Sequence, residues 1–339
     1  MGVPAILGAW ILAGAAVGSA TTWLARRYAL HRRLIDQPGE RRSHQAATPR
    51  GGGVSIVVVL LLACGALALA APGRAVPIAL AATGLSLVAG IGWIDDHRPL
   101  SPWLRLGVHV LAGVLLAAAL RLAGGGWPDL ATAFVAAVAL TNVWNFMDGI
   151  DGIAASQALL VAAAWALFAG HGPVLWLGAA LAAAAAGFLP FNFPRARIFL
   201  GDVGSGALGY ALAALLALAS MRGANETRLL LALPLLPFLL DASFTLLSRI
   251  VRGEDWWRPH VQHAYQAWAR RRGGHVGVTA AYALATLLLA SAMFSMQSWG
   301  STLIMMTYMM FLLAGWVAWR LLRGDRAQAG PGNFRDGNP

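Results

Sequence analysis

Residues 134–152 read FVAAVALTNVWNFMDGIDG, an apolar run that passes directly into a stretch with two carboxylates, two glycines and two amides. In a soluble protein such a polar stretch is a solvated loop. Here it ends a hydrophobic segment, 129–146, that is long enough to cross a bilayer, which takes about 20 residues as a helix. The pattern indicates polar chemistry placed at the end of a membrane-spanning helix.

The composition of the whole chain supports this interpretation. Hydrophobic residues make up 58% of the 339 positions and charged residues only 12%, whereas a soluble domain carries about a quarter charged residues. The apolar residues also come in long runs, and runs of about 18 or more indicate membrane spans. The sequence therefore predicts an all-α integral membrane protein. The lone Cys64 implies no disulfide framework.

We predict about eleven transmembrane helices in a single polytopic domain, residues 1–322. The first span has no basic residue before it and Arg26 and Arg27 after it, which is the reverse of a cleaved signal peptide. The polar, Gly- and Pro-rich segment 323–339 predicts a disordered cytoplasmic tail. The expected spans are 4–24, 52–71, 76–94, 104–122, 129–146, 153–170, 174–191, 204–221, 228–250, 278–297 and 302–322.

The arginines divide the connections between these spans into two sets. One set carries only Arg74, Arg121, Arg222 and Arg228, whereas the other set carries most of the remaining arginines. Connections rich in positive charge face the cytoplasm. The sequence therefore predicts an external N-terminus and a cytoplasmic C-terminus.

Every large polar cluster falls on the arginine-rich side. A single cluster of this kind is as often a solvated connector as a site. Five of them on one face, each with acids, amides, histidines or arginines, predict one composite active site on the cytoplasmic face. They are DQPGERRSHQAATPRGGG (36–53), WIDDHRPLSP (93–102), NVWNFMDGIDG (142–152), FNFPRARIFLGDVGSG (191–206) and RGEDWWRPHVQHAYQ (252–266).

Five aspartates in these clusters are candidates for the chemistry. Asp95 and Asp96 end a span as an adjacent pair, and because neighbours on a helix point about 100° apart they need not share one ligand. Asp148 and Asp151 each precede a glycine, so the backbone there need not be helical. Asp202 lies near the start of the eighth span, where a helix N-terminus with Gly and Ser can cradle a phosphate; an ordinary N-cap is the alternative.

Several carboxylates that face one another repel unless a cation lies between them. Carboxylate and amide oxygens suit Mg²⁺ or Mn²⁺, and Mg²⁺ typically takes one or two carboxylates together with substrate phosphates. The surrounding arginines suit an anion. A metal, arginines and a membrane face together indicate a phosphorylated substrate with a lipid partner.

The polar clusters together resemble one membrane family, the polyprenyl-phosphate N-acetylhexosamine-1-phosphate transferases. This superfamily, bacterial glycosyltransferase family 4, includes the enzymes that start peptidoglycan, teichoic acid and O-antigen lipid intermediates. The absence of a large insertion and the ending HAYQ are most similar to the subgroup that initiates O-antigen or related surface polysaccharides. The matching stretches follow in family order: TPRGGG (48–53), DDHRPLSP (95–102), NVWNFMDGIDG (142–152), NFPRARIFLGDVGSGALG (192–209) and HVQHAYQ (260–266).

The resemblance implies a reaction at a bacterial inner membrane, with the N-terminus periplasmic. Undecaprenyl phosphate attacks the β-phosphorus of a UDP-N-acetyl-hexosamine, UMP leaves, and a polyprenyl diphosphate sugar remains in the lipid bilayer. Mg²⁺, or Mn²⁺, is the implied cofactor. No nucleic acid is implied and a homodimer is compatible with the family. The sequence does not choose among N-acetylglucosamine, its epimers and 6-deoxy forms.

The resemblance also implies roles for residues. Asp95 and Asp96 match the catalytic acidic pair, and Asp202 with Asn145 matches the Mg²⁺ site. Because a phosphate has its second pKa near 6 and is largely ionised at physiological pH, an orienting role for the acidic pair ranks at least equal to base catalysis. The implied contacts to the substrates are Asp148, Asp151, Asn192, Arg50, Arg105, His260 and His263.

One position departs from the family. Close relatives carry arginine directly after the first histidine of the last motif, where this chain has Val261. Arginine is a natural bidentate partner for phosphate, and Arg258 is the nearest replacement. Because Pro259 biases Arg258 toward an extended conformation, we expect its side chain to bind the substrate phosphate. An interfacial arginine facing lipid headgroups is the alternative.

Asp241 lies inside the ninth span, after Pro234 and Pro237, which we expect to kink the helix. An intramembrane acid is a functional candidate, but pairing with a neighbouring helix is slightly favoured here. His109 and His171 are expected to be packing or interface residues.

Two other classes of protein stay open. A secondary transporter also carries intramembrane acids and broken helices, but this sequence shows no internal repeat and its acids gather on one face. A non-catalytic lipid-binding scaffold predicts neither Mg²⁺ dependence nor UMP release.

Overall fold

The computed structural model describes residues 2–37, 47–221, 223–255, 257–258, 260–272 and 274–324. The predicted tail lies outside the described residues from 325 onward, as does Pro259. The helices are α1 (Val3–His31), α2 (Val54–Ala70), α3 (Ala75–His97), α4 (Pro102–Leu122), α5 (Trp127–Met147), α6 (Ile153–Ala169), α7 (Gly172–Asn192), α8 (Gly201–Ser220), α9 (Asn225–Ala232), α10 (Leu236–Val251), α11 (Ala264–Arg272), α12 (His275–Ser295) and α13 (Ser301–Arg323). The remaining elements are the 3₁₀ turns η1 (Pro72–Arg74) and η2 (Leu233–Leu235) and the antiparallel strands β1 (Ile35–Asp36) and β2 (Thr48–Pro49).

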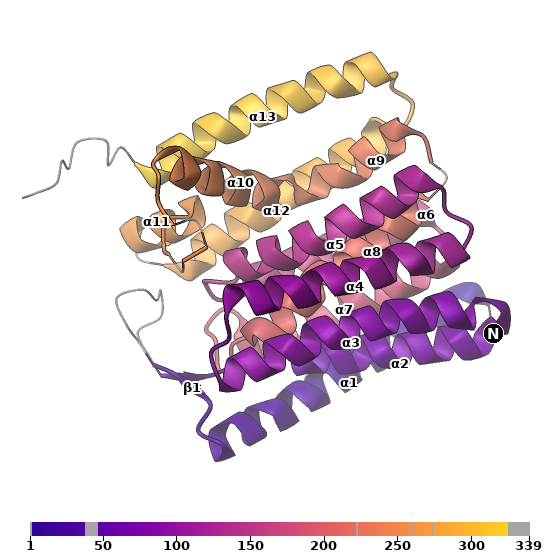
Figure 1. Ribbon diagram of the computed structural model, residues 1–339, viewed down its shortest axis with the longest axis horizontal. Coiled ribbons are helices and arrows are strands. Elements are labelled where there is room, and N and C mark those ends of the chain that lie inside the picture. The colour runs from indigo at the N-terminus through magenta and orange to yellow at the C-terminus, as the bar shows by residue number, and fades with distance from the viewer. Residues whose placement is uncertain are drawn as a thin grey trace, which may run out of the picture.

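The long helices form an elongated bundle and run along its length (Figure 1). In the described part of the chain, nine helical segments are long and apolar enough to cross a membrane, with α9, η2 and α10 counted as one. Two further apolar helices, α2 and α6, have 17 residues each. Each predicted span coincides with one of these segments, and the predicted all-α integral membrane protein is confirmed.

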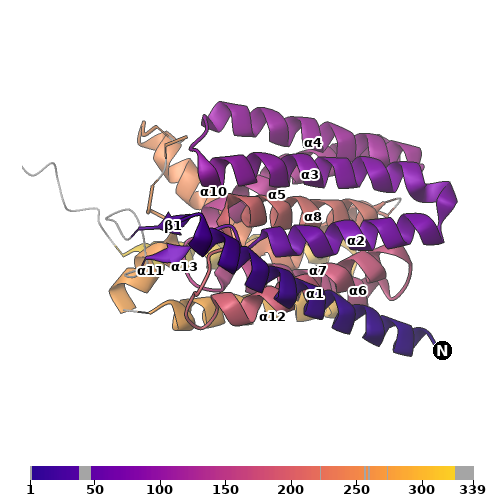
Figure 2. The same cartoon turned by 90° about the horizontal axis from the view of Figure 1, so that it is seen from below.

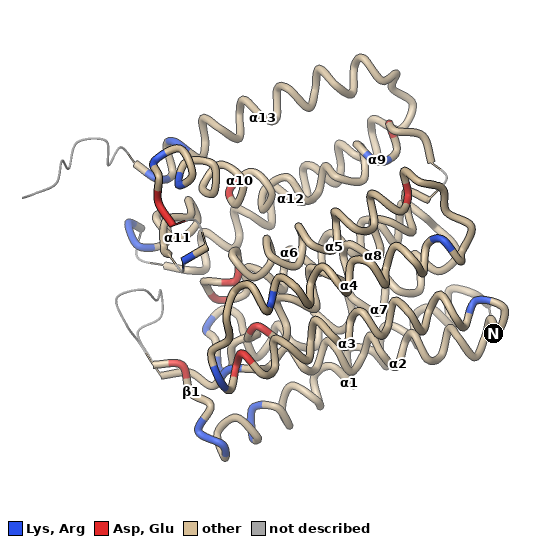
Figure 3. The backbone as a smooth tube through the Cα atoms, in the orientation of Figure 1, with Lys and Arg blue, Asp and Glu red and all other residues tan. Residues whose placement is uncertain are grey.

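Charged residues gather at one end of the bundle (Figure 3). That end holds β1, α11 and the C-terminal end of α13, whereas the N-terminal end of α1 lies at the opposite end (Figure 1). The described parts of the five polar clusters all lie in the loops and helix termini at the charged end. The fold therefore brings segments far apart in the sequence onto one face of the bundle.

α8 is the innermost helix. Most of its side chains are buried, it packs against α3 and α5, and Figure 2 shows it in the middle of the bundle. This packing requires glycine, because a Cβ on Gly92 would lie 2.5 Å from the carbonyl carbon of Asp202, and one on Gly53 would overlap the Cα of Gly204. The glycines let the backbones of α2 and α3 touch the start of α8, where Asp202 lies.

Differences from the sequence-based expectation lie at helix ends and in the last loop. α1 continues to His31, past the predicted end at residue 24, and neither α11 nor the β1–β2 pair is predicted. α11 is short and polar, so neither length nor apolar periodicity marks it in the sequence. The kink expected from Pro234 and Pro237 is confirmed, because η2 interrupts the helix between α9 and α10.

Candidate active site

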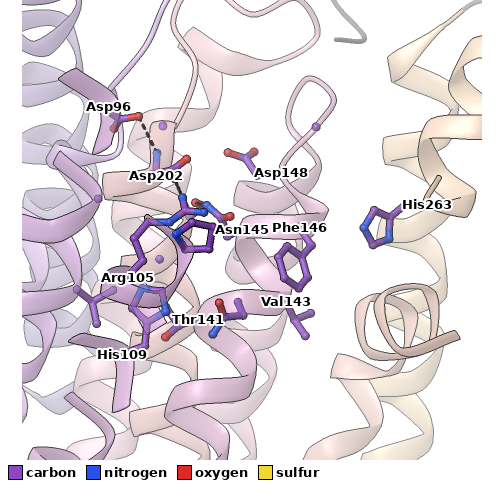
Figure 4. A pocket seen from close by; sticks show the side chains of 18 of the residues that line it. Asp96, Arg105, His109, Thr141, Val143, Asn145, Phe146, Asp148, Asp202 and His263 are labelled. Atoms are coloured by element: carbon purple, nitrogen blue, oxygen red, sulfur yellow. Dashed lines mark hydrogen bonds and ion pairs between the residues drawn. The ribbon is translucent and has the colours of Figure 1, made fainter. Parts of the chain in front are cut away.

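A cavity of about 770 Å³ opens at the charged end of the bundle. Its walls come from α3, α4, α5, α8 and α10 and from loops at the charged end, which include those after α5, before α8 and before α11. Figure 4 shows side chains that line it. The structure therefore brings the predicted residues together, while their roles stay predictions. The predicted residues that line the cavity are Arg50, Asp96, Arg105, Asn145, Asp148, Asp151, Asn192, Asp202, Arg258, His260 and His263.

Asp96 caps the helix that carries Asp202. Its Oδ1 accepts the main-chain N–H of Asp202 at 3.0 Å, and its Oδ2 accepts that of Val203 at 3.2 Å. The first N–H groups of a helix have no partner within the helix, and the helix dipole favours a carboxylate there. Gly201 has φ of +76°, and a Cβ at this position would lie 2.5 Å from Asp96 Oδ2. Asp96 of α3 thus fixes the start of α8.

Arg105 joins Asp95 to Asp202. Its Nη1 lies 2.9 Å from Asp95 Oδ2 and 2.5 Å from Asp202 Oδ2. The other oxygen of Asp95 accepts the N–H of Leu100 at 2.6 Å. One guanidinium nitrogen therefore lies between two carboxylates that face one another, which reduces their repulsion.

Arg50 holds the C-terminal end of α3. Its Nε and Nη2 donate to the carbonyl oxygens of Asp96 and Asp95, each at 3.0 Å. Its loop is paired with the loop before α8, where the N–H of Gly53 donates to the carbonyl of Leu200 at 2.8 Å. Arg50 Nε also lies 3.4 Å from Asp96 Oδ1, and the side chain, 26% exposed, lines the cavity.

Asn145 and Asp148 lie at the end of α5, opposite Asp202 (Figure 4). Asn145 Nδ2 donates to Ser205 Oγ at 3.1 Å, which leaves the amide oxygen of Asn145 for another partner. Although part of Asp148 opens on the cavity, its carboxyl group is enclosed by protein. This enclosure, and then the nearby carboxylates with Asp202 foremost, raise the pKa of Asp148 to about 8. The ionised form of Asp148 is therefore disfavoured in the folded protein, first by burial and then by the neighbouring acids.

Asp151 is paired with a histidine that the sequence motifs do not include. His275 Nδ1 lies 3.3 Å from Asp151 Oδ2 and accepts from the Asp151 main-chain N–H at 3.3 Å. Thr279 Oγ1 donates to the Asp151 carbonyl at 2.8 Å. α12 thus fixes the loop between α5 and α6. The only signal for His275 in the sequence is its position at the start of an apolar segment, on the arginine-rich side.

Asn192 connects two loops. Its Oδ1 accepts the N–H of Gly152 at 2.9 Å, and its Nδ2 donates to the carbonyl of Ile198 at 3.0 Å. The residue is buried, with one side on the cavity. Asn192 therefore holds the loop after α7 against the loop before α6, and its contact with substrate stays a prediction.

The loop before α11 brings two histidines to the cavity. The rings of His260 and His263 stack with their centroids 4.9 Å apart, and His263 is buried. Burial, and then the neighbouring His263, lower the pKa of His260 to about 3, so His260 is neutral at physiological pH. Arg258 has a side chain that is 72% exposed, with Nε 2.7 Å from Asp255 Oδ2. A phosphate would have to compete with this ion pair for Arg258.

His109, expected to be a packing residue, also lies in the cavity wall. It is buried beneath Arg105 (Figure 4), and its Nδ1 has no hydrogen-bond partner among the described residues. The expectation was correct for burial and missed the contact with the cavity.

Comparison with known proteins decides the family. Residues 78–220 match the family described as glycosyl transferase family 4. A decaprenyl-phosphate N-acetylglucosaminephosphotransferase of Mycobacterium leprae is 31% identical over 277 residues, which cover 68% of this chain and 69% of the relative. The chain belongs to the polyprenyl-phosphate N-acetylhexosamine-1-phosphate transferase superfamily.

Other members of this superfamily match to differing extents. A probable undecaprenyl-phosphate N-acetylglucosaminyl 1-phosphate transferase of Bacillus subtilis is 26% identical over 266 residues, which cover 73% of this chain and 74% of the relative. A phospho-N-acetylmuramoyl-pentapeptide-transferase of Moorella thermoacetica is 38% identical over 201 residues, or 50% of this chain. The chain spans 62% of the length of the Moorella protein.

The match to glycosyl transferase family 4, residues 78–220, covers the acids of the cavity but not its last loop. Residues 78–220 contain the acidic pair of α3, the end of α5 and the start of α8. The histidine loop and its partners on α10 and α12 lie beyond the matched residues. The resemblance predicts His260 and His263 in the site, and the structure brings α10 and α11 against the end of α5 and packs α12 against α6.

The oxygen donors of this family member fit a Mg²⁺ ion that takes most of its ligands from substrate and water. In the part of the chain that the structure describes, no group of three or more His, Cys, Asp or Glu side chains could hold a metal by itself. Mg²⁺ usually binds one or two protein carboxylates together with phosphate oxygens and water. Asp202 and the remaining amide oxygen of Asn145 provide such a set.

Proposed function

We propose that the protein transfers an N-acetyl-hexosamine-1-phosphate from a UDP-sugar to undecaprenyl phosphate and releases UMP. The observation that carries this proposal is the Asp95–Arg105–Asp202 cluster, in and beside one cavity at the end of an apolar bundle. Relatives from Bacillus subtilis and Thermotoga maritima are named as undecaprenyl-phosphate N-acetylglucosaminyl 1-phosphate transferases, which supports N-acetylglucosamine as the sugar.

The position of the cavity suits one lipid and one soluble substrate. A polyprenyl chain stays in the bilayer beside the apolar helices, while its phosphate reaches the end of the bundle where the charged loops lie. A UDP-sugar enters the same cavity from water. This explains why the stretch 142–152 places amides and carboxylates directly at the end of a membrane-spanning helix.

The reaction forms one bond and breaks one. An oxygen of the lipid phosphate attacks the β-phosphorus of the UDP-sugar, and the bond from this phosphorus to the oxygen shared with the α-phosphate breaks, so that UMP leaves. Phosphoryl transfer depends mostly on alignment and neutralisation of charge. Arg50 and Arg105 supply positive charge for the phosphates, and the neutral His260 can donate one hydrogen bond to the phosphates or the sugar.

Mg²⁺, with Mn²⁺ as the alternative, is the proposed cofactor, and Asp202 and Asn145 would hold it. When bound, it would neutralise charge on the diphosphate and on the departing UMP. Four aspartates line the cavity, Asp96, Asp148, Asp151 and Asp202, and this supports a cation at this place, because a divalent ion relieves repulsion among carboxylates.

Asp95 and Asp96 are proposed to orient groups rather than to remove a proton. Both oxygens of Asp96 bind main-chain N–H groups of α8, and the oxygens of Asp95 bind Leu100 and Arg105. A lipid phosphate is already largely ionised at physiological pH. These contacts support alignment of Asp202 and Arg105 as the contribution of the acidic pair.

We further propose that the cavity faces the cytoplasm of a bacterial inner membrane, with the N-terminus periplasmic, because the arginines gather on that side. Cysteine labelling in intact cells tests this orientation. With Cys64 replaced, Asn225→Cys should react with impermeant reagents and Ser101→Cys only with permeant ones. The reverse labelling pattern would place the cavity outside and overturn this part of the proposal.

The product is proposed to start O-antigen or another surface polysaccharide. The resemblance of the HAYQ ending supports this pathway, while the Moorella relative is named for N-acetylmuramoyl-pentapeptide. Purified protein is incubated with undecaprenyl phosphate, Mg²⁺ and either UDP-N-acetylglucosamine, its epimer, a 6-deoxy form or UDP-N-acetylmuramoyl-pentapeptide, and UMP is measured. We expect UMP with a simple UDP-N-acetyl-hexosamine. UMP only with the pentapeptide substrate would overturn the pathway, and no UMP with any donor would overturn the function.

A further inference from the structure

Asp241 of α10 is a buried acid that none of the steps above uses. The residue is 3% exposed and does not line the cavity. A carboxylate enclosed by apolar helices is costly unless several donors satisfy it. The donors that surround Asp241 therefore indicate its role.

Four donors meet the carboxylate of Asp241. Its Oδ1 accepts the N–H of Ala264 at 2.8 Å and the hydroxyl of Thr245 at 3.2 Å. Its Oδ2 accepts the N–H of Tyr265 at 3.0 Å and the hydroxyl of Tyr282 at 2.7 Å. An ionised carboxylate accepts only and offers about four lone-pair sites, so this set of donors matches the charged form.

The two main-chain donors are the first N–H groups of α11. Such groups have no partner within their own helix, and a carboxylate satisfies them. The residue before this helix is His263, whose Nδ1 lies 3.6 Å from Asp241 Oδ1. Asp241 therefore fixes the start of α11 together with the last residue of the histidine loop, residues 260–263.

Tyr265 extends this contact to the acidic loop, residues 145–151. Its hydroxyl donates to the carbonyl of Phe146 at 3.0 Å. A Cβ on Gly149 would overlap this hydroxyl, so the two segments meet closely. The ring of Phe146 also stacks near that of His263, with centroids 6.3 Å apart. A continuous set of contacts thus runs from Asp241 to the loop that carries Asp148.

We propose that Asp241 is a positioning residue that holds the histidine loop against the acidic loop, so that both meet the same diphosphate substrate. The contacts that carry this inference are intramolecular, whereas the identity of the substrate rests on the proposed function. Asp96 acts in the same way from α3, where it caps α8 and fixes Asp202.

Asp241→Asn tests the inference, because asparagine keeps the size but replaces one acceptor oxygen with an NH₂ donor. That donor faces an N–H or a hydroxyl, so at least one cap hydrogen bond is lost. We expect kcat/KM for the UDP-sugar to fall by about tenfold or more, the effect of one hydrogen bond to a charged group. The KM for undecaprenyl phosphate should stay within about twofold of wild type, because the histidine loop is proposed to meet the UDP-sugar. Asp241→Glu, which keeps the charge, should recover part of the loss.

Hydrogen exchange supplies a readout that does not depend on activity. In Asp241→Asn, the main-chain amides of Ala264 and Tyr265 and those of residues 145–151 should exchange about tenfold faster than in wild type. Tyr282→Phe removes a single donor to Asp241 and should shift exchange and kinetics in the same direction by a smaller factor. This variant keeps the inference testable if Asp241→Asn does not fold.

Asp129→Asn is the matched control. Asp129 is an equally buried acid in α5, but it lies at the opposite end of the bundle, 2.7 Å from Arg228. The Asp129→Asn variant should have a lower melting temperature, with no change in UDP-sugar kinetics or in hydrogen exchange of the α11 amides. Unchanged hydrogen exchange in both Asp241→Asn and Tyr282→Phe would overturn the inference. A loss of kcat/KM in Asp129→Asn as large as that in Asp241→Asn would also overturn it. If wild type releases no UMP from any UDP-sugar, the proposed function fails, and the exchange data still decide the role of Asp241.

Discussion

Asp202 connects three helices, because it belongs to α8 and contacts Asp96 of α3 and Arg105 of α4. Its main-chain N–H donates to Asp96, its carboxylate faces Arg105, and it lies in the first turn of α8. The main-chain hydrogen bond fixes the position of Asp202, whereas its carboxylate contributes negative charge to the site. Position and chemistry are therefore separable at this residue, and mutation can test each one.

Asp202→Asn should keep the fold, because the cap made by Asp96 involves only the main chain. It should lower kcat by about 100-fold or more, or roughly 2.7 kcal/mol, because a charge is lost from the proposed metal site. Turnover is measured across a Mg²⁺ titration, with the melting temperature as the check on folding. Near wild-type turnover at saturating Mg²⁺ would contradict the assignment of Asp202 as a metal ligand.

Arg258→Ala should raise the KM for the UDP-sugar or lower kcat by about tenfold or more, the equivalent of one charge-assisted hydrogen bond at roughly 1.5–3 kcal/mol. Val261→Arg in that background should recover part of the loss. Arg252→Ala is the matched control, because Arg252 is exposed and does not line the cavity. If Arg258→Ala is silent while His260→Ala is inactive, the phosphate contact belongs to the histidines.

Asp148 makes the metal-free protein sensitive to pH. Its pKa in the folded protein is about 8, above the unfolded value near 3.9, so the folded state binds the proton more tightly. Stability therefore falls as pH rises from about 4 to about 8. With a chelator present, Asp148→Asn should melt a few °C above wild type at pH 8 and at about the same temperature at pH 4.5. Equal melting temperatures at pH 8 would show that ionised Asp148 does not destabilise the folded protein, and would contradict the raised pKa.

At the scale of elements, α8 and α11 are placed in the same way. Each begins at the charged end, and a carboxylate from a membrane-spanning helix accepts its first N–H groups: Asp96 for α8 and Asp241 for α11. The spans themselves could be predicted, because apolar runs of about 18 or more residues are typical of membrane-spanning helices. The caps could not, since Asp96 and Asp202 are 106 positions apart and nothing local pairs them.

Gly92→Ala tests how closely α3 must approach α8. The new Cβ would lie 2.5 Å from the carbonyl carbon of Asp202, so the two backbones must separate and the start of α8 must move. We expect a lower melting temperature and a loss of kcat of about tenfold or more, because a misplacement of about 1 Å can cost 100-fold. Gly90→Ala, in the same helix, meets nothing within 4 Å and should leave both quantities unchanged. Equal effects of the two variants would show that helix propensity, not the approach to α8, decides the outcome.

At the scale of the whole molecule, the bundle gathers most of its charged residues at one end and has few along its length (Figure 3). The sequence could predict this separation, and the resemblance to the superfamily could predict the acids of the site, because each motif is continuous in the chain. His275 and the pairing of Asp241 with the start of α11 could not be found in this way. His275 and Asp241 are single polar residues in otherwise apolar segments, and only the packing of α10 and α11 against the end of α5, and of α12 against α6, places them around the site.

Transfer of the β-phosphate distinguishes the proposed chemistry from transport and from lipid binding without catalysis. UDP-N-acetylglucosamine labelled with ³²P at the β-phosphorus is incubated with purified protein, Mg²⁺ and undecaprenyl phosphate, and the lipid and water phases are separated. A sugar-1-phosphate transferase moves the label into the lipid phase and leaves unlabelled UMP in water in equal amount. Label that stays in water as UDP while the sugar enters the lipid, or label that never leaves the donor, would contradict the proposal.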